Sequence, residues 1–388
     1  MLQKVIVLGA NTFQLGLINY LNESGFETHV ITNQPNDIGV KLAHVCHLID
    51  YTDIDEVWKV FKSINAKQIF SVASDASILC QSIIQQKAGL LGSTPDFIQF
   101  FNNKNLYKKQ LKNVLPSNAP NLMLCKNKQD VFHFFSNYKQ DGIILKPKIG
   151  SGSKNVKHII DVKSIDSLTL QLNLNDYILE EFINGQEFGG DFICFNGKLL
   201  FYFPTLKKTN QLNVPISHLV LMSNYNLPKV MEFIQSVISA LNLENGVFNV
   251  DIILKNKQWF LLDISPRIGG NCIPDVIALS TGINEWKFIT EWLLTNNANN
   301  LYFKWNKPSG VYILHSMKEG IIVEMVTKNH PFGKAIVSIY WKVKTTTNVQ
   351  IFDEGSKHLG YVIYQAKTDE ELLNLSNKIE KFQWFRLS

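Results

Sequence analysis

Short apolar runs alternate with helix-spaced apolar positions through the first quarter of the chain. The run Lys4–Leu8 predicts a strand, and the leucine and isoleucine positions after it predict a helix that ends at Gly25. Further strands are expected at Thr28–Thr32 and Gln68–Val72. Strands that alternate with helices are typical of a parallel sheet covered on both faces. We therefore expect a parallel α/β domain over about residues 1–95.

The middle of the chain favours strands, hairpins and two helical stretches. The helical stretches are Thr94–Val114, which is basic, and Pro228–Leu241. Asn196-Gly197 between two apolar runs predicts the turn of a β-hairpin, because both residues accept a positive φ. Apolar strands are expected at Gly142–Pro147, Tyr177–Glu181, Val247–Leu254 and Trp259–Ile264. Residues 96–300 are assigned to this second region.

From about Pro308 the chain is again rich in strands with hairpin turns, and an amphipathic helix is expected over Thr368–Ile379. Residues 301–388 are therefore expected to form a β-rich C-terminal subdomain. The fold class that follows is a mixture of α/β and α+β, with a parallel sheet first and hairpin-linked strands later.

The composition is that of an ordinary globular protein. Of 388 residues, 45% are hydrophobic and 18% are charged, which excludes a disordered chain or a fibrous repeat. Lysine and arginine number 38 against 33 aspartate and glutamate residues, a net charge of +5 with no dense basic run. We therefore expect neither nucleic acid nor a membrane as a partner.

Cysteine usage and hydropathy point to the cytoplasm. The five cysteines are odd in number, widely spaced and without a CxxC pair, so they predict reduced thiols and neither a disulfide framework nor a zinc site. No segment reaches the roughly 18 consecutive apolar residues that a membrane-spanning helix needs. The first residues lead directly into a strand without a signal-peptide pattern. A cytoplasmic protein is expected.

The two strands near residue 250 carry a pair of carboxylates. A hairpin places Asp251 and Asp263 across from each other, and period-two alternation places Ser265 on the same face as Asp263. Two carboxylates at close range repel unless a cation lies between them, and hard oxygen ligands suit Mg²⁺ or Mn²⁺. Arg267 and the glycines after it add a fixed cation and flexible amides. The alternative is that both aspartates are solvated turn residues.

Two further elements favour an anion site. Lys146 ends a strand and precedes the small-residue loop Gly150-Ser151-Gly152-Ser153, whose backbone N–H groups could approach phosphate oxygens. This is not the P-loop pattern, and ordinary hairpin turns often have the same composition.

Glu180-Glu181-Phe182-Ile183 closes an apolar strand, with Glu187 a short distance beyond. That segment could contact an adenine edge and ribose hydroxyls, or it could be an exposed acidic turn.

The order of these elements resembles that of the ATP-grasp superfamily, in the branch that contains biotin carboxylase and the large chain of carbamoyl-phosphate synthase. The motifs cover about residues 100–275, and the layout covers nearly the whole chain. Asp263-x-Ser265-Pro266-Arg267 is similar to the Glu-x-Asn-Pro-Arg of that branch. Gly9-x-Asn11-x-x-Gln14-x-Gly16 looks like the start of the Rossmann-like domain that precedes ATP-grasp regions. The resemblance implies a two-lobed ATP-grasp fold for the second region.

The resemblance also implies roles for individual residues. Nucleotide phosphates would be bound by Lys104, Lys146 and the mobile loop Gly150, Ser151, Gly152 and Ser153. Adenine would be held by Glu180, Glu181, Phe182 and Ile183, and the ribose by Glu187. The metal ligands would be Asp251, Asp263 and Ser265. Arg267 would be catalytic, because it would stabilise an acyl phosphate or orient the substrate carboxylate.

The implied activity is ATP-dependent ligation of a small carboxylate to an amine such as an amino acid, with release of ADP and phosphate. ATP and Mg²⁺ or Mn²⁺ would be the cofactors, the two small molecules would be the partners, and a homodimer is one option for the assembly. The chain departs from the branch at two positions, where Asp263 replaces Glu and Ser265 replaces Asn. Aspartate is shorter by one methylene, so the metal would lie closer to the strand or water would fill the gap.

Two other classes of protein stay open. A nicotinamide-dependent dehydrogenase would use the N-terminal domain, although Gly9 to Gly16 does not form GxGxxG. A module that binds ATP without turnover would keep the lysines and carboxylates but release no ADP. Cys272, close to Gly270, is expected to be a small buried residue and not a nucleophile. No general base is assigned.

Overall fold

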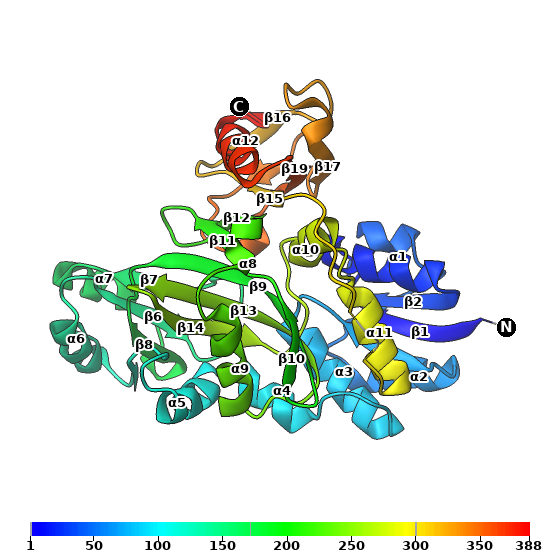
Figure 1. Cartoon of the computed structure of the whole chain (residues 1–388), viewed down its shortest axis with the longest axis horizontal. Coiled ribbons are helices and arrows are strands. Elements are labelled where there is room, and N and C mark those ends of the chain that lie inside the picture. Colours follow the sequence, from blue (N-terminus) through cyan, green and yellow to red (C-terminus); the bar gives the residue numbers. More distant parts are fainter. Residues whose placement is uncertain (1, 171, 299–300) are drawn as a thin grey trace.

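The computed structural model describes residues 2–170, 172–298 and 301–388, and it opens with a parallel sheet (Figure 1). The strand order is β3-β2-β1-β4, and all neighbouring pairs are parallel, which confirms the prediction from alternating strands and helices. The strands are β1 (Gln3–Leu8), β2 (Phe26–Thr32), β3 (Val45–Leu48) and β4 (Gln68–Ser71). The helices around them are α1 (Leu15–Glu23), α2 (Ile54–Ser63) and α3 (Asp75–Ala88).

Two helices, and not one continuous helix, follow this sheet. α4 (Pro95–Asn102) and α5 (Lys104–Val114) meet at Asn103, whose backbone is extended with φ −102° and ψ 100°. The Asn103 side chain accepts a hydrogen bond from the N–H of Asn105. Asn103 therefore ends the first helix and caps the second, because a short polar side chain satisfies amides that a helix start leaves open. The break places Lys104 at the first position of α5.

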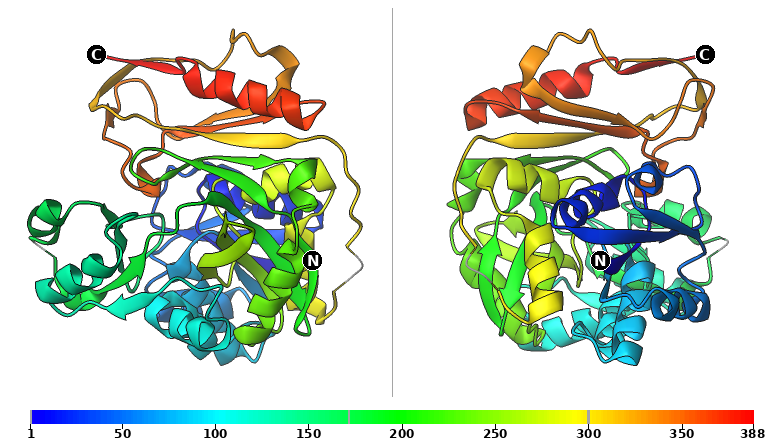
Figure 2. Two further views of the ribbon diagram at one scale, coloured as in Figure 1. Left: turned by 60° about the vertical axis from the view of Figure 1, so that its left-hand side comes forward. Right: turned by 90° about the vertical axis from the view of Figure 1, so that its right-hand side faces the viewer.

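A small antiparallel sheet of order β5-β8-β6-β7 forms the first lobe of the middle region. Its strands are β5 (Leu122–Leu124), β6 (Ile143–Pro147), β7 (Lys157–Ile159) and β8 (Tyr177–Glu181). α6 (Lys128–Asn137) and α7 (Ile165–Thr169) pack on it and complete a small hydrophobic core around Phe134 and Leu179. The left view of Figure 2 shows this lobe projecting from the rest of the molecule. Because the lobe has its own hydrophobic core, its strands and loops form one packed unit.

A nine-stranded sheet forms the second lobe, in the order β14-β13-β9-β11-β12-β15-β19-β17 with β10 paired to β9. Its strands are β9 (Gln186–Phe195), β10 (Lys198–Tyr202), β11 (Thr205–Thr209), β12 (Pro215–Val220), β13 (Gly246–Lys255), β14 (Gln258–Ser265), β15 (Ser309–Leu314), β17 (Ile336–Trp341) and β19 (Gly360–Gln365). The predicted hairpin turn is confirmed, with φ 49° at Asn196 and 72° at Gly197. The accompanying helices are α8 (Met222–Tyr225), α9 (Val230–Ala240), α10 (Ile273–Thr281) and α11 (Glu285–Thr295).

The C-terminal segment is β-rich, as predicted, and it continues the large sheet. β15 pairs with β12, and β19 then pairs with β15 and β17. A separate three-stranded sheet of β16 (Gly320–Met325), β18 (Asn348–Val349) and β20 (Phe385–Leu387) lies beside α12 (Asp369–Lys381) at the top of Figure 1. The shared sheet brings the C-terminal loops next to the middle region.

One hydrophobic core joins the N-terminal sheet to the large sheet. It includes Val5 and Val30 of the parallel sheet together with Trp286 of α11. The two packed helices come close together at Gly16 of α1, where an added Cβ would lie 2.6 Å from Nε1 of Trp286. Only a glycine lets the two helices pack at this distance, so the N-terminal sheet is fixed against the second lobe. Among the described residues, no helix is long and apolar enough to cross a membrane.

Candidate active site

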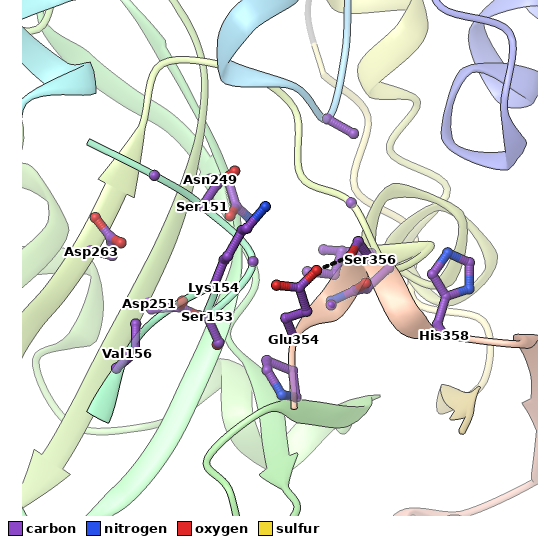
Figure 3. Close-up of a pocket in the computed structure, with 18 of the residues that line it drawn as sticks. Ser151, Ser153, Lys154, Val156, Asn249, Asp251, Asp263, Glu354, Ser356 and His358 are labelled. Atoms are coloured by element: carbon purple, nitrogen blue, oxygen red, sulfur yellow. Dashed lines mark hydrogen bonds between the residues drawn. The ribbon is translucent and has the colours of Figure 1, made fainter. Parts of the chain in front are cut away.

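All three parts of the chain line one cavity of about 930 Å³. The first lobe contributes β6 and the small-residue loop after it, and the large sheet contributes side chains of β11, β12, β13 and β14. Loops of the N-terminal sheet and of the C-terminal segment close the other end. Figure 3 shows side chains from these separate segments around the shared space. Every site residue predicted from the sequence lines this cavity except Ser265.

Asp251 and Asp263 lie directly opposite each other in the pairing of β13 with β14, which is the predicted register. Oδ2 of Asp263 is 3.2 Å from Nζ of Lys104, and its Oδ1 accepts a hydrogen bond from the hydroxyl of Tyr107. Oδ1 of Asp251 is 3.0 Å from Nζ of Lys207. Each carboxylate therefore has a lysine partner of its own, and these lysines relieve the repulsion between the two aspartates.

Positive charge dominates the surroundings of Asp263. Although burial alone raises the pKa of its carboxyl, Lys104, Lys146 and Lys108 together hold that pKa well below its ordinary value. Asp263 is therefore ionised at neutral pH. An ionised carboxylate beside several lysines is the charge pattern expected where a metal and phosphate groups are bound together.

Ser265 lies outside the cavity lining, which differs from the prediction that it shares the role of Asp263. The chain bends after β14, where the N–H of Arg267 donates to the carbonyl of Ser265 at 2.8 Å. Asn249, directly across from Ser265 on β13, lines the cavity instead. Its Nδ2 donates to Oδ1 of the buried Asp191 at 2.7 Å, so its amide is held in place.

Lys146 and Glu180 form a buried ion pair on adjacent strands, with Nζ and Oε2 2.6 Å apart. Lys108 completes the group from α5, with Nζ 2.9 Å from Oε1 of Glu180. Burial lowers the pKa of Lys108 to about 8 although Glu180 attracts its charge. The two lysines outweigh the effect of burial on Glu180 and lower its pKa.

The contacts of Glu180 and Glu181 limit how the hinge segment could meet a base. The Glu180 carboxylate is occupied by Lys108 and Lys146, and that of Glu181 accepts two hydrogen bonds from Asn121 at 2.9 and 3.0 Å. Neither carboxylate is therefore available to adenine, and the hinge can present only its backbone and the side chains that follow. Phe182, the next residue, lines the cavity with its ring stacked on His158.

The small-residue loop is held from two sides. Nζ of Lys104 donates to the carbonyl of Gly150 at 2.8 Å, so the lysine that contacts Asp263 also contacts the loop. On the other side, the N–H of Gly355 donates to the carbonyl of Gly152 at 2.8 Å. Figure 3 shows Ser151, Ser153 and Lys154 along the cavity, opposite Glu354 and Ser356. The loop thus lies between the first lobe and the C-terminal segment.

Two residues of the site were missed in the sequence. Lys207 is only 8% exposed and contacts Glu187 at 3.2 Å as well as Asp251. His218 on the next strand is buried and lines the cavity, and within the described residues its Nε2 has no hydrogen-bond partner. Burial lowers the pKa of His218 to about 3, so the imidazole is neutral. The adjacent lysines Lys207 and Lys208 could have indicated the role of Lys207, because side chains alternate along a strand and one of two neighbours points inward.

Arg267 connects the second lobe to the N-terminal sheet. Its Nε is 2.7 Å from Oδ1 of Asp75, the first residue of α3. One terminal nitrogen donates to the carbonyl of Ile268 at 3.2 Å, and the side chain still lines the cavity. The guanidinium is therefore fixed in direction, as a group that orients a substrate carboxylate has to be.

A family model described as an ATP-grasp domain matches residues 101–271, the part of the chain that carries these motifs. An uncharacterized protein of Methanocaldococcus jannaschii is 26% identical over 339 residues, which are 83% of this chain and 81% of that protein.

Two solved structures share the fold. Phosphoribosylglycinamide synthetase from Anaerococcus prevotii superposes with a TM-score of 0.76 at 23% identity, over 100% of both chains. L-amino acid ligase from Bacillus licheniformis superposes with a TM-score of 0.83 at 13% identity, over 100% of this chain and 98% of the other. The family model and the shared fold agree with the motifs gathered in the cavity. Residues 101–271 are therefore an ATP-grasp domain, and the chain as a whole shares the fold of these ligases.

Proposed function

We propose that the protein is an ATP-dependent ligase that activates a small carboxylate as an acyl phosphate and joins it to an amine, with release of ADP and phosphate. The observation that carries the proposal is the opposed pair Asp251 and Asp263, which shares one cavity with Lys104, Lys146 and Arg267. Carboxylate and triphosphate are both anions, and a site that brings them together has to neutralise both.

The nucleotide would lie between the two lobes. Lys104 and Lys146 face the cavity beside the loop Gly150–Ser153, and these groups would bind the phosphates. The hinge at Phe182 and Ile183 would contact adenine through its backbone and apolar side chains, and Glu187 would accept from the ribose. The Glu180 carboxylate would hold Lys146 in place and would not touch the base.

Asp251 and Asp263 fit a magnesium ion, because both are hard oxygen donors on opposed strands of one cavity. Among the described residues, no three His, Cys, Asp or Glu side chains form a complete metal cage. Phosphate oxygens and water would therefore fill the other positions, which is the arrangement that Mg²⁺ prefers. When bound, Mg²⁺ would neutralise charge on the phosphate oxygens.

In the first step, a substrate carboxylate oxygen attacks the terminal phosphorus of ATP, and ADP leaves. Lys104 and Lys146 offset the negative charge on the phosphates, and Arg267 orients the attacking carboxylate. In the second step, the amine attacks the acyl carbon, the carbon–oxygen bond to phosphate breaks, and the amine loses a proton. The 2.7 Å contact with Asp75 would hold the direction of Arg267 through both steps.

The experiment is an ADP-release screen with pairs of amino acids and small carboxylates, followed by chromatography of the spent nucleotide. ADP and phosphate as products support the acyl-phosphate route, whereas AMP and pyrophosphate would rule it out. Calorimetry with a non-hydrolysable ATP analogue tests the site separately. Binding should need Mg²⁺ and should weaken in Lys146→Ala but not in Lys148→Ala, because Lys148 lies outside the cavity lining. Binding without ADP release from any pair would indicate a nucleotide-binding module.

A further inference from the structure

One end of the cavity lies beyond the groups assigned to the nucleotide. We call it the junction end, and its lining includes Phe13, Asp37, Tyr340, Trp341, Lys342 and His358. These residues come from loops of the N-terminal sheet and from the C-terminal segment. The whole cavity of about 930 Å³ is near the upper end of the roughly 300–1,000 Å³ range of ligand pockets. The junction end therefore has room for a second small molecule beside a nucleotide.

The junction end adjoins the candidate catalytic arginine. A Cβ added to Gly270 would lie 3.7 Å from Cζ of Phe13, so the Phe13 ring packs beside the loop that begins with Arg267. The Phe13 ring centroid is also 5.9 Å from that of His358. Phe13 thus connects the arginine loop to the C-terminal segment, and a molecule bound here would have one end within reach of Arg267.

Two opposite charges face the junction end with little compensation. Asp37 has a weak 3.5 Å contact with the hydroxyl of Thr32, and Nζ of Lys342 donates to the carbonyl of Ser356 at 2.8 Å. In the described part of the chain, neither side chain has an ion-pair partner within 4.0 Å, although Asp37 and Lys342 lie close enough for each to affect the pKa of the other. Loss of hydration raises the pKa of Asp37 and lowers that of Lys342. A ligand with an ammonium and a carboxylate would supply the partner that each group lacks.

The charge balance distinguishes the kind of ligand. Lys41 and Glu354 add one further charge of each sign, and Arg267 adjoins this end as one more cation. A phosphate monoester carries up to two negative charges and would need a larger surplus of cations, as the small-residue loop has with Lys104 and Lys146. The junction end therefore suits a ligand that carries one charge of each sign.

Aromatic side chains form the remaining walls. Phe13, Tyr340 and Trp341 are only partly buried, and Trp341 donates its indole N–H to the carbonyl of Val326 at 3.0 Å. The Trp341 ring can therefore offer the ligand an apolar surface. His358 adds a polar group that is 7% exposed and whose Nδ1 has no partner within the described residues. Burial lowers the pKa of His358 to about 3, so it offers a neutral hydrogen-bonding group.

We infer that the junction end binds a free α-amino acid with a bulky apolar side chain, as one of the two substrates to be joined. Asp37 would contact the ammonium, Lys342 the carboxylate, and Phe13 and Trp341 the side chain. This inference rests on the proposed ligase function and adds to it the class of one substrate and the residues that select it.

Calorimetry of amino-acid binding tests the inference, with the free protein and again with Mg²⁺ and the ATP analogue. L-leucine and L-phenylalanine should bind at least tenfold more tightly than glycine, because only they fill the aromatic walls. Leucinamide and N-acetyl-L-leucine, which each lack one charge, should also bind at least tenfold more weakly than leucine.

Variants test which charged group of the ligand each side chain contacts. Lys342→Gln should weaken leucine binding about tenfold and leave leucinamide binding unchanged, because that ligand has no carboxylate. Asp37→Asn should weaken leucine and leucinamide alike. Lys344→Gln is the matched control, since Lys344 is two residues from Lys342 and outside the cavity lining. Phe13→Ala should reduce the preference for leucine over glycine.

Three results would overturn the inference. They are absence of amino-acid binding with and without the nucleotide analogue, equal effects of Lys342→Gln and Lys344→Gln, and tighter binding of ribose 5-phosphate than of any amino acid. These results are separate from the test of the ligase itself. A failure of Mg²⁺-dependent binding of the ATP analogue would count against the proposed function, whereas the amino-acid titration without nucleotide reports on the junction end alone.

Discussion

Nζ of Lys207 lies 3.0 Å from Oδ1 of Asp251, and the same ammonium is 3.2 Å from Glu187. Lys207 therefore joins the proposed metal ligand to the proposed ribose acceptor. Although burial lowers the pKa of Lys207, the two carboxylates outweigh it and raise that pKa above the ordinary value. A cation that binds at Asp251 has to share this carboxylate with the lysine.

Lys207→Met should strengthen the binding of Mn²⁺ to the nucleotide-free protein, because it frees both carboxylates. The same change should lower the free energy of unfolding by less than the roughly 3–5 kcal/mol typical of a fully buried pair, since Glu187 and Asp251 are partly exposed to water. Thermal melts with increasing Mn²⁺ measure both effects, and the melting temperature of the variant should rise with Mn²⁺ more than that of the parent protein.

Lys208→Met is the control for this prediction. Lys208 is the next residue of β11, and its Nζ contacts Asn377 and Glu380 on the far side of the strand. Its melts should respond to Mn²⁺ as the parent protein does. Equal responses of the two variants would mean that Lys207 does not compete with a metal.

Asp263→Asn should lower kcat by about 10²–10³, the loss typical for removal of one group that stabilises developing charge. The structure adds a cost to folding, because Lys104 and the Tyr107 hydroxyl both contact this carboxylate. The melting temperature without metal should therefore fall as well. Steady-state rates at saturating Mg²⁺ and metal-free melts separate the two effects, and near-parental turnover would remove Asp263 from the site.

Glu180→Gln should destabilise the fold far more than Glu181→Gln. Glu180 is the shared partner of Lys108 and Lys146, so its neutralisation removes the carboxylate that both buried ammonium groups contact directly and leaves only Asp263 to offset them, at a cost of roughly 3–5 kcal/mol. Within the described residues, the Glu181 carboxylate accepts hydrogen bonds from Asn121 alone, and glutamine can partly keep them. Urea unfolding of both variants decides this. Similar midpoints would favour the alternative in which both glutamates belong to an exposed acidic turn.

Asp275 makes stability depend on pH in the mildly acidic range. Burial raises the pKa of its carboxyl to about 6, so the folded state holds more protons than the unfolded state between about pH 4 and 6. Stability from this group therefore falls as the pH rises through that window. Asp275→Asn should raise the melting temperature above pH 6 and change it little below pH 4.

Asp96→Asn is the matched control for Asp275, because each aspartate follows a proline at the start of a helix. Asp96 is exposed, so its replacement should not produce a gain in stability that appears only above pH 6. If the Asp275 and Asp96 variants had parallel curves of melting temperature against pH, the assigned role of burial would be wrong.

The features predictable from the sequence are those set by neighbouring residues. The pairing of β13 with β14 follows from a short turn between two apolar runs, because the turn fixes the register of a hairpin. The turn alone would place Asp251 opposite Leu262, and a one-residue irregularity between Asp251 and Ile252 shifts the register so that Asp251 faces Asp263. The parallel sheet follows from local alternation in the same way. The break at Asn103 was also locally encoded, since asparagine is a strong helix cap, and it was missed because the helical pattern continues on both sides.

The rest depends on contacts between distant segments. Arg267 contacts Asp75 across 192 positions, and no local pattern relates the two. The ion pairs of Glu180 with Lys108 and Lys146 likewise depend on how α5, β6 and β8 pack together. Motif order predicts which residues line the cavity, whereas the partner that each charge takes depends on packing.

The hydrogen bond from Gly355 to Gly152 has a thermodynamic consequence. It fixes the small-residue loop Gly150–Ser153 to the C-terminal segment at Gly355. The next residue, Ser356, accepts the hydrogen bond from Lys342. If the nucleotide holds the loop and an amino acid holds Lys342, both ligands act on the same short stretch of backbone. Linkage then requires reciprocity, so the factor by which the nucleotide raises the amino acid's affinity equals the factor by which the amino acid raises that of the nucleotide. Titrations in the two orders of addition would measure one coupling free energy twice.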